Sequence, residues 1–171
     1  MLNKSEFHEN QIMNKKNKEI GLNFILDIDG VLTDGSFYYS EKGKMLKKFG
    51  AHDNDGIKLL KPFFNVSLIT ADVKGFQISK LRAKHMGLKI KLVNEENRYS
   101  YFEKIGFNKC IFAGDGHYDA PILKKVLLGF APKNSVEIAK KNANYVTKNN
   151  GGEGAVYEIC MKIIKHFKIK L

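Results

Sequence analysis

The sequence has few cysteines, and their scarcity excludes two kinds of structural support. Only two occur among the 171 residues, Cys110 and Cys160, and each lies among apolar neighbours. A disulfide framework needs several paired cysteines, and a zinc site needs clustered ligands. We therefore expect two buried free thiols.

Long hydrophobic runs are also missing. No apolar stretch approaches the roughly 20 residues that a membrane-spanning helix requires. Residues 3–19 are polar apart from isolated apolar positions, so the apolar core of a signal peptide is absent. These absences predict a cytoplasmic protein with no membrane partner, in which residues 1–20 form a polar leader and residues 21–171 a single domain.

Basic residues are abundant, and the formal net charge is +11. Lysine and arginine are nevertheless spread along the whole chain, without the interleaved basic and aromatic residues of a nucleic-acid stacking platform. A solvated, lysine-rich surface is the favoured interpretation, and we expect no nucleic-acid partner. Charge alone motivates a weaker alternative, action on nucleic-acid ends. A small phosphorylated and carboxylated substrate would suit the same charge.

From residue 23 onward, short apolar runs alternate with amphipathic stretches. The expected strands are 24–26, 66–69, 89–93, 110–113, 127–131 and 145–146; the expected helices lie near 55–62, 73–86, 97–105, 119–126, 135–142 and 153–167. This alternation predicts an α/β fold of the Rossmann-like, three-layer type, with a parallel sheet covered by helices on both faces.

One segment breaks the alternation. Residues 36–40 and 45–49 read as two short strands, and Gly43 lies in the turn between them. The pattern predicts a β-hairpin inserted into the first strand-to-helix crossover. The remaining length leaves no room for a separate cap domain.

Polar residues follow three of the expected strands where each one ends. Asp27 and Asp29 follow the first, Thr70 the second, and Asp115 and Asp119 the fourth. In an open parallel sheet, ligands bind beyond the carboxyl ends of the strands. We therefore expect these side chains to form one site.

So many carboxylates in one place would repel one another without a cation. Mg²⁺ prefers oxygen ligands and would also neutralise a phosphate. An aspartate can attack phosphorus to form an acyl-phosphate, while a second carboxyl group handles the leaving group's proton. Gly30 would allow a sharp turn that brings backbone N–H groups to the phosphate. The competing interpretation of Asp27 and Asp29 is a pair of solvated turn aspartates.

This set of residues resembles the signature of the haloacid dehalogenase superfamily, Asp-x-Asp-Gly, then Thr or Ser, a Lys or Arg, and a late acidic pair. The resemblance implies that Asp27 is the nucleophile and Asp29 the general acid/base. It also implies that Asp27, the Asp29 backbone carbonyl and Asp115 hold Mg²⁺, supported by Asp119. Thr70 and the cation, aligned here as Arg98, would bind the phosphate together with the Gly30 turn.

Three longer stretches, 29–35 followed by the aromatic hairpin, 49–57 and 151–156, point to a subgroup within this superfamily. They are similar to the capless subgroup that includes 3-deoxy-D-manno-octulosonate 8-phosphate phosphatase and sialic-acid-type 9-phosphate phosphatases. The resemblance covers residues 23–164 and implies a phosphorylated 2-keto-3-deoxy sugar acid as substrate. It also implies a homotetramer in which the hairpin at 36–49 and the segment 151–154 close a neighbour's site.

Two positions depart from the subgroup's pattern. Arg98 stands where the family usually has lysine, and Lys74 is the alternative candidate for that cation. Asp72 stands where the subgroup's Thr-Gly-Arg has arginine, and we favour a helix-capping role for it over substrate contact. These departures support an alternative function, a catalytically weak assembly module.

Three further groups of residues receive structural interpretations. His117 is expected to be an exposed loop histidine. Capping and substrate contact are equally favoured for Asp53. The aromatic residues Phe37, Tyr38 and Tyr39 are expected to pack at a subunit interface rather than to form a binding box.

Overall fold

The computed structural model describes residues 21–171, so the predicted leader at 1–20 lies outside the described part of the chain. Six strands form one parallel sheet in the order β5-β4-β1-β6-β7-β8. Their bounds are β1 Asn23–Asp27, β4 Asn65–Thr70, β5 Lys89–Leu92, β6 Cys110–Ala113, β7 Leu128–Ala131 and β8 Tyr145–Val146. The predicted parallel α/β sheet is confirmed.

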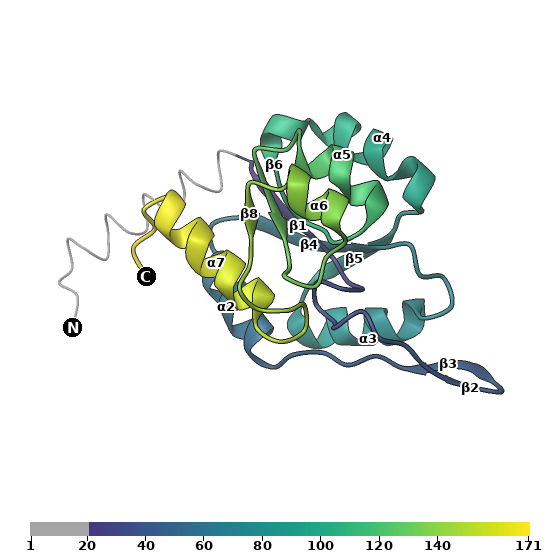
Figure 1. Ribbon diagram of the computed structural model, residues 1–171. Helices are drawn as coiled ribbons and strands as arrows, with labels where there is room; N and C mark the ends of the chain where they lie inside the picture. The colour runs from purple at the N-terminus through teal and green to yellow at the C-terminus, as the bar shows by residue number, and fades with distance from the viewer. Residues whose placement is uncertain (1–20) are drawn as a thin grey trace.

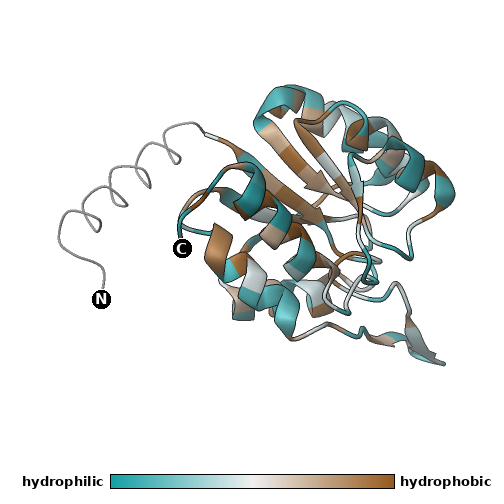
Figure 2. Cartoon of the chain, turned by 60° about the vertical axis from the view of Figure 1, so that its left-hand side comes forward, coloured by the Kyte–Doolittle hydropathy of each residue, from teal (hydrophilic) through white to brown (hydrophobic). Residues whose placement is uncertain are grey.

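Helices cover both faces of this sheet (Figure 1). One group contains α2 (His52–Leu60), α3 (Phe76–Met86) and α7 (Ala155–His166); the other contains α4 (Glu95–Ile105), α5 (Ala120–Leu123) and α6 (Glu137–Asn142). Strand residues alternate between two hydrophobic cores, since Phe24 and Leu26 pack with the first group and Ile25 with the second. Figure 2 shows hydrophobic residues along the strands between the helical layers.

The predicted hairpin is present as β2 (Tyr38–Ser40) and β3 (Gly43–Leu46), paired antiparallel. It extends away from the sheet, at the lower right of Figure 1. Its strands are shorter than predicted, because residues 36–37 and 47–49 continue the two arms without regular pairing.

Helix ends differ from the sequence-based bounds in one informative place. The helix expected at 119–126 is regular only over α5, and the residues before it form a 3-10 turn, His117–Asp119. The Asp119 carboxylate accepts hydrogen bonds from the backbone N–H groups of Asp115 and Gly116, at 3.0 and 2.9 Å. These bonds hold a tight turn just before α5. Residues 124–126 continue as a turn and a bend, so the helix also ends earlier than expected.

Both cysteines are free and buried, as predicted. Within residues 21–171, no helix has the length and apolar character needed to cross a bilayer.

Candidate active site

Three neighbouring strands deliver the polar residues to one edge of the sheet. Asp27 is the last residue of β1 and Thr70 the last of β4, while Asp115 follows β6 by two residues. Since β1 lies between β4 and β6, their carboxyl ends meet. A cavity of about 490 Å³ opens there, lined by Asp27, Asp29, Thr70, Arg98 and Asp115 among others.

The loop after β1 is held by its own hydrogen bonds. The carbonyl oxygen of Ile28 accepts from the N–H groups of Val31, Leu32 and Thr33. The buried Thr33 hydroxyl accepts from the N–H of Gly30 at 3.2 Å. Gly30 has a φ of +85°, and a Cβ there would overlap the Asp115 carboxylate. The loop therefore needs glycine both for its turn and for the approach of Asp115.

Two glycines near the C-terminal helix, Gly151 and Gly152, also hold this loop in place. The N–H of Gly152 donates to the carbonyl oxygen of Val31 at 3.0 Å. A Cβ on Gly151 would overlap the Gly30 carbonyl oxygen, and both glycines are buried. Gly151 and Gly152 therefore pack inside their own subunit. Closure of a neighbour's site by the segment 151–154 stays a prediction.

The carboxylate of Asp27 is paired with Arg98. Arg98 Nη1 lies 2.8 Å from Asp27 Oδ2 and 2.6 Å from Asp119 Oδ1. The other oxygen of Asp27 accepts from the N–H of Ile28 at 2.8 Å. Arg98 is buried on α4 and reaches the site, whereas the alternative cation, Lys74, is exposed and does not line the cavity. Arg98 thus bridges two carboxylates that would otherwise repel each other.

Arg98 does not neutralise all the negative charge of this cluster, and ionisation of the remaining carboxylates is unfavourable. Burial raises the pKa of Asp27 to about 7, although Arg98 opposes the shift. Burial also raises the pKa of Asp115 to about 8, and the nearby charges of Asp27 and Asp119 add to it. Ligand oxygens of Asp27, Asp115 and Asp119 all lie within 4.8 Å of one another. A hard cation bound there would relieve this repulsion, so the residues present fit a divalent metal.

Asp29 lies on the other side of the cavity and has a partner that sequence reasoning missed. Lys47 Nζ lies 2.7 Å from Oδ1 and 2.8 Å from Oδ2 of Asp29. The hydroxyl of Thr70 donates to Asp29 Oδ2 at 3.3 Å. Lys47 also donates to the Ser79 hydroxyl at 3.0 Å. Asp29 is therefore held by a cation from the inserted hairpin and by the end of β4.

Comparison with known proteins decides the family. A model of haloacid dehalogenase-like hydrolases matches residues 91–159. The 3-deoxy-D-manno-octulosonate 8-phosphate phosphatase KdsC of Escherichia coli strain K12 is 32% identical over 143 residues, which is 80% of this chain and 75% of that protein. The chain belongs to the haloacid dehalogenase-like hydrolases. Within that family it is a phosphatase.

Solved structures of similar proteins share the fold of this haloacid dehalogenase-like phosphatase. A probable YrbI family phosphatase from Pseudomonas syringae has a TM-score of 0.77 and 29% identity, with 89% of each chain covered. The 3-deoxy-D-manno-octulosonate 8-phosphate phosphatase from Moraxella catarrhalis, in complex with magnesium, phosphate and KDO, has a TM-score of 0.75 and 26% identity over 90% of this chain and 91% of that one.

Asp72 stands where this phosphatase departs from its subgroup, and it contacts a backbone N–H group and two lysines. Its Oδ1 accepts from the N–H of Gly75 at 3.0 Å, just before α3. Its Oδ2 lies 2.6 Å from Lys44 Nζ and 2.8 Å from Lys47 Nζ. Burial opposes ionisation, but these two lysines lower the pKa of Asp72 to about 2. Asp72 thus combines a turn-capping bond with two ion pairs.

Among the structural interpretations, His117 is exposed as expected. Asp53 is buried and caps α7, since its Oδ1 accepts from the N–H groups of Val156 and Tyr157. Phe37 lines the cavity, and its ring lies under Lys44. Packing of Phe37, Tyr38 and Tyr39 at a subunit interface stays a prediction. Phe37 lies in an irregular arm of the hairpin, where the sequence has no period that would reveal which way its side chain points.

Proposed function

We propose that this phosphatase hydrolyses the phosphate monoester of a small sugar acid through an aspartyl-phosphate on Asp27, with Mg²⁺ as its cofactor. The observation that carries the proposal is the cluster of Asp27, Asp115 and Asp119 at the carboxyl end of the sheet, in which Asp27 and Asp119 are buried against Arg98. A nucleophilic carboxylate, a cation and metal-binding oxygens in one cavity are what such a transfer requires.

The metal would be held by the carboxylates of Asp27 and Asp115 and by the backbone carbonyl of Asp29, with Asp119 supporting them. The raised pKa values of Asp27 and Asp115 support this assignment, because burial and neighbouring carboxylates disfavour their ionised forms and a bound cation would favour them. Bound there, Mg²⁺ would neutralise charge on the phosphate and let the carboxylate approach it.

Thr70, Arg98 and the N–H groups of the Gly30 turn would bind the phosphate. Arg98 Nη1 is engaged by Asp27 and Asp119, but its buried Nε has no hydrogen-bond partner among residues 21–171. A buried donor without a partner is costly, and a phosphate oxygen would satisfy it.

The reaction would proceed in two displacements. An oxygen of Asp27 attacks phosphorus while the bond from phosphorus to the ester oxygen breaks, and Asp29 gives a proton to the leaving alkoxide. Asp29 then takes a proton from water, which attacks the aspartyl-phosphate and releases inorganic phosphate and free Asp27. Lys47 and Thr70 would orient Asp29 during both steps.

The substrate would be 3-deoxy-D-manno-octulosonate 8-phosphate or a sialic-acid-type 9-phosphate. The names of the bacterial relatives support the first of these. Because relatives at this level of similarity are phosphatases, the alternative of an assembly module without turnover is not proposed.

The test is a measurement of phosphate release from both sugar acid phosphates, with Mg²⁺ and after chelation. We expect turnover of at least one of them, lost on chelation and restored by Mg²⁺. Turnover unaffected by chelation would overturn the proposed cofactor, and no release from either compound would overturn the proposed substrate class.

A further inference from the structure

Two lysines of the inserted hairpin lie at the site: Lys44 lines the cavity, and Lys47 pairs with Asp29, which also lines it. The two differ in how many of their hydrogen-bond donors are already used. Lys47 Nζ contacts Asp29, Asp72 and the Ser79 hydroxyl. An ammonium group has three donors, so these three partners use all of them. The Lys47 side chain is also fully buried. Lys47 therefore has no donor left for a ligand.

Lys44 is held by Asp72, but in the described part of the chain its ammonium group still has free hydrogen-bond donors. Its Nζ donates to Asp72 Oδ2 at 2.6 Å and lies 3.4 Å from the centroid of the Phe37 ring. Within residues 21–171, Asp72 is its one hydrogen-bonding partner, so donors remain for a further acceptor. Lys44, Phe37 and Asp72 all line the cavity that contains Asp27.

The charges explain why Lys44 rather than Asp72 would meet an anionic ligand. Asp72 shares its oxygens among Lys44, Lys47 and the N–H of Gly75, which leaves its charge neutralised. The arginine expected at this position by resemblance is missing, and a cation from the hairpin lies beside it instead. The phosphate end of the cavity already holds its own cation, Arg98.

We propose that Lys44, anchored by Asp72 and stacked on Phe37, binds the carboxylate of the substrate and so selects phosphorylated sugar acids over neutral sugar phosphates. The inference rests on the proposed function and adds a residue that determines specificity. The aromatic ring would cover the carbon chain of the ligand beside that carboxylate.

The experiment compares Lys44→Met with wild type on two substrates, 3-deoxy-D-manno-octulosonate 8-phosphate and ribose 5-phosphate, which has no carboxylate. Methionine keeps an unbranched apolar side chain beside Phe37 and removes the charge. We expect KM for the sugar acid phosphate to rise about tenfold or more, the loss of one charge-assisted hydrogen bond. For ribose 5-phosphate, kcat/KM should stay within about twofold. Lys44→Arg should restore most of the selectivity.

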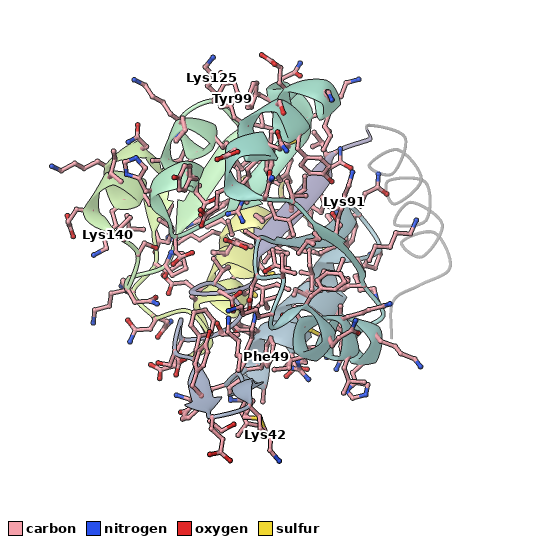
Figure 3. The ribbon with its side chains drawn as sticks, turned by 90° about the vertical axis from the view of Figure 1, so that its right-hand side faces the viewer. Lys42, Phe49, Lys91, Tyr99, Lys125 and Lys140 are labelled. Carbon is pink, nitrogen blue, oxygen red and sulfur yellow. The ribbon has the colours of Figure 1, made fainter. Side chains whose placement is uncertain are left out.

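Lys42 supplies the matched control, because it is an exposed lysine at the tip of the same hairpin (Figure 3). Lys42→Met should leave both substrates unaffected. If Lys44→Met lowers kcat/KM equally for both substrates, Lys44 only supports the fold of the hairpin and the inference is wrong.

The kcat/KM of the wild-type enzyme on the two substrates distinguishes a failure of this inference from a failure of the proposed function. Equal kcat/KM for the two substrates would show a phosphatase that ignores the carboxylate, which overturns the role of Lys44 and leaves phosphate hydrolysis intact. Absence of turnover on both, and on a sialic-acid-type 9-phosphate, would overturn the proposed function and this inference with it.

Discussion

Arg98 is the residue on which the electrostatics of the site depend most. It is buried and lies between Asp27 and Asp119, at 2.8 and 2.6 Å. Arginine differs from the usual lysine by its planar fork, which can hold two carboxylates and still present Nε toward a phosphate. The sequence predicted the position of this cation, but only the fold reveals that it bridges Asp27, at the end of β1, and Asp119, in the 3-10 turn that follows β6.

Removing Arg98 should therefore slow the reaction rather than unfold the chain. Arg98→Ala is expected to cost on the order of 2–4 kcal/mol of transition-state stabilisation, as for other preorganised donors. Arg98→Lys should recover much of this loss, since lysine supplies the same charge. Measured kcat/KM for both variants tests the expectation, and an Arg98→Ala enzyme within about twofold of wild type would contradict it.

Asp27 and Asp115 should make stability depend on both pH and metal. Their pKa values are raised from 3.8 to about 7 and about 8, so the folded chain binds more protons than the unfolded chain between those values. Their contribution to stability is fully present below about pH 4 and is lost as the pH rises through 7 and 8.

Mg²⁺ should reverse that loss, because it binds the ionised carboxylates. We expect the increase in Tm on adding Mg²⁺ to be larger at pH 8.5 than at pH 6, measured by thermal unfolding against a chelated sample. An equal increase at both pH values would contradict the assignment of these two carboxylates to the metal.

At the scale of elements, the packing of α2 against α7 is fixed by a buried carboxylate. Asp53, in the first turn of α2, accepts from the N–H groups of Val156 and Tyr157 at the start of α7. Gly56 faces α7 closely, since a Cβ there would lie 2.9 Å from the Tyr157 Cα. The two helices therefore support each other beside the loop that carries Asp29.

Replacing Asp53 by alanine should destabilise the fold by about 1–3 kcal/mol, because two N–H groups at a helix start lose their acceptor. The matched control is Asp55→Ala, since Asp55 is exposed and, within residues 21–171, pairs only with His52 and Lys58 on its own helix. Chemical denaturation measures both changes. A loss for Asp53→Ala no larger than the control's, about 0.5 kcal/mol or less, would refute the capping role.

Regular elements were predictable from the sequence, whereas irregular ones were not. The alternation of apolar residues predicts the strands, and the polar residues that end them place Asp27, Thr70 and Asp115 together. The strands of the hairpin are short and largely exposed and show no such alternation, so the inward direction of Lys44 and Lys47 could not be predicted. Their positions depend on pairing with Asp72 and Asp29, which are distant in sequence.

At the scale of the whole molecule, the hairpin carries a group of exposed apolar side chains. Tyr38, Tyr39, Met45 and Leu46 on it are each 51–62% exposed. A cavity without a cap domain would be left open to water in an isolated subunit. We therefore propose a homotetramer in which exposed hairpin residues pack against neighbouring subunits.

Light scattering of the purified chain at assay concentration tests this assembly. We expect the mass of a tetramer, and a double variant, Tyr39→Asp with Leu46→Asp, should dissociate it and lower activity, because charged residues cannot be buried at an apolar interface. A monomeric wild type with full activity would contradict the proposal.

The central claim is that Asp27 is the nucleophile, and replacing it by asparagine tests this most directly. The substitution keeps the shape of the side chain and removes the attacking charge, so thermal unfolding should show a folded protein. We predict that phosphate release is abolished in Asp27→Asn and that acid-quenched wild type, but not the variant, carries covalent phosphate from labelled substrate. A variant that retained about a tenth of wild-type turnover or more would contradict the aspartyl-phosphate mechanism.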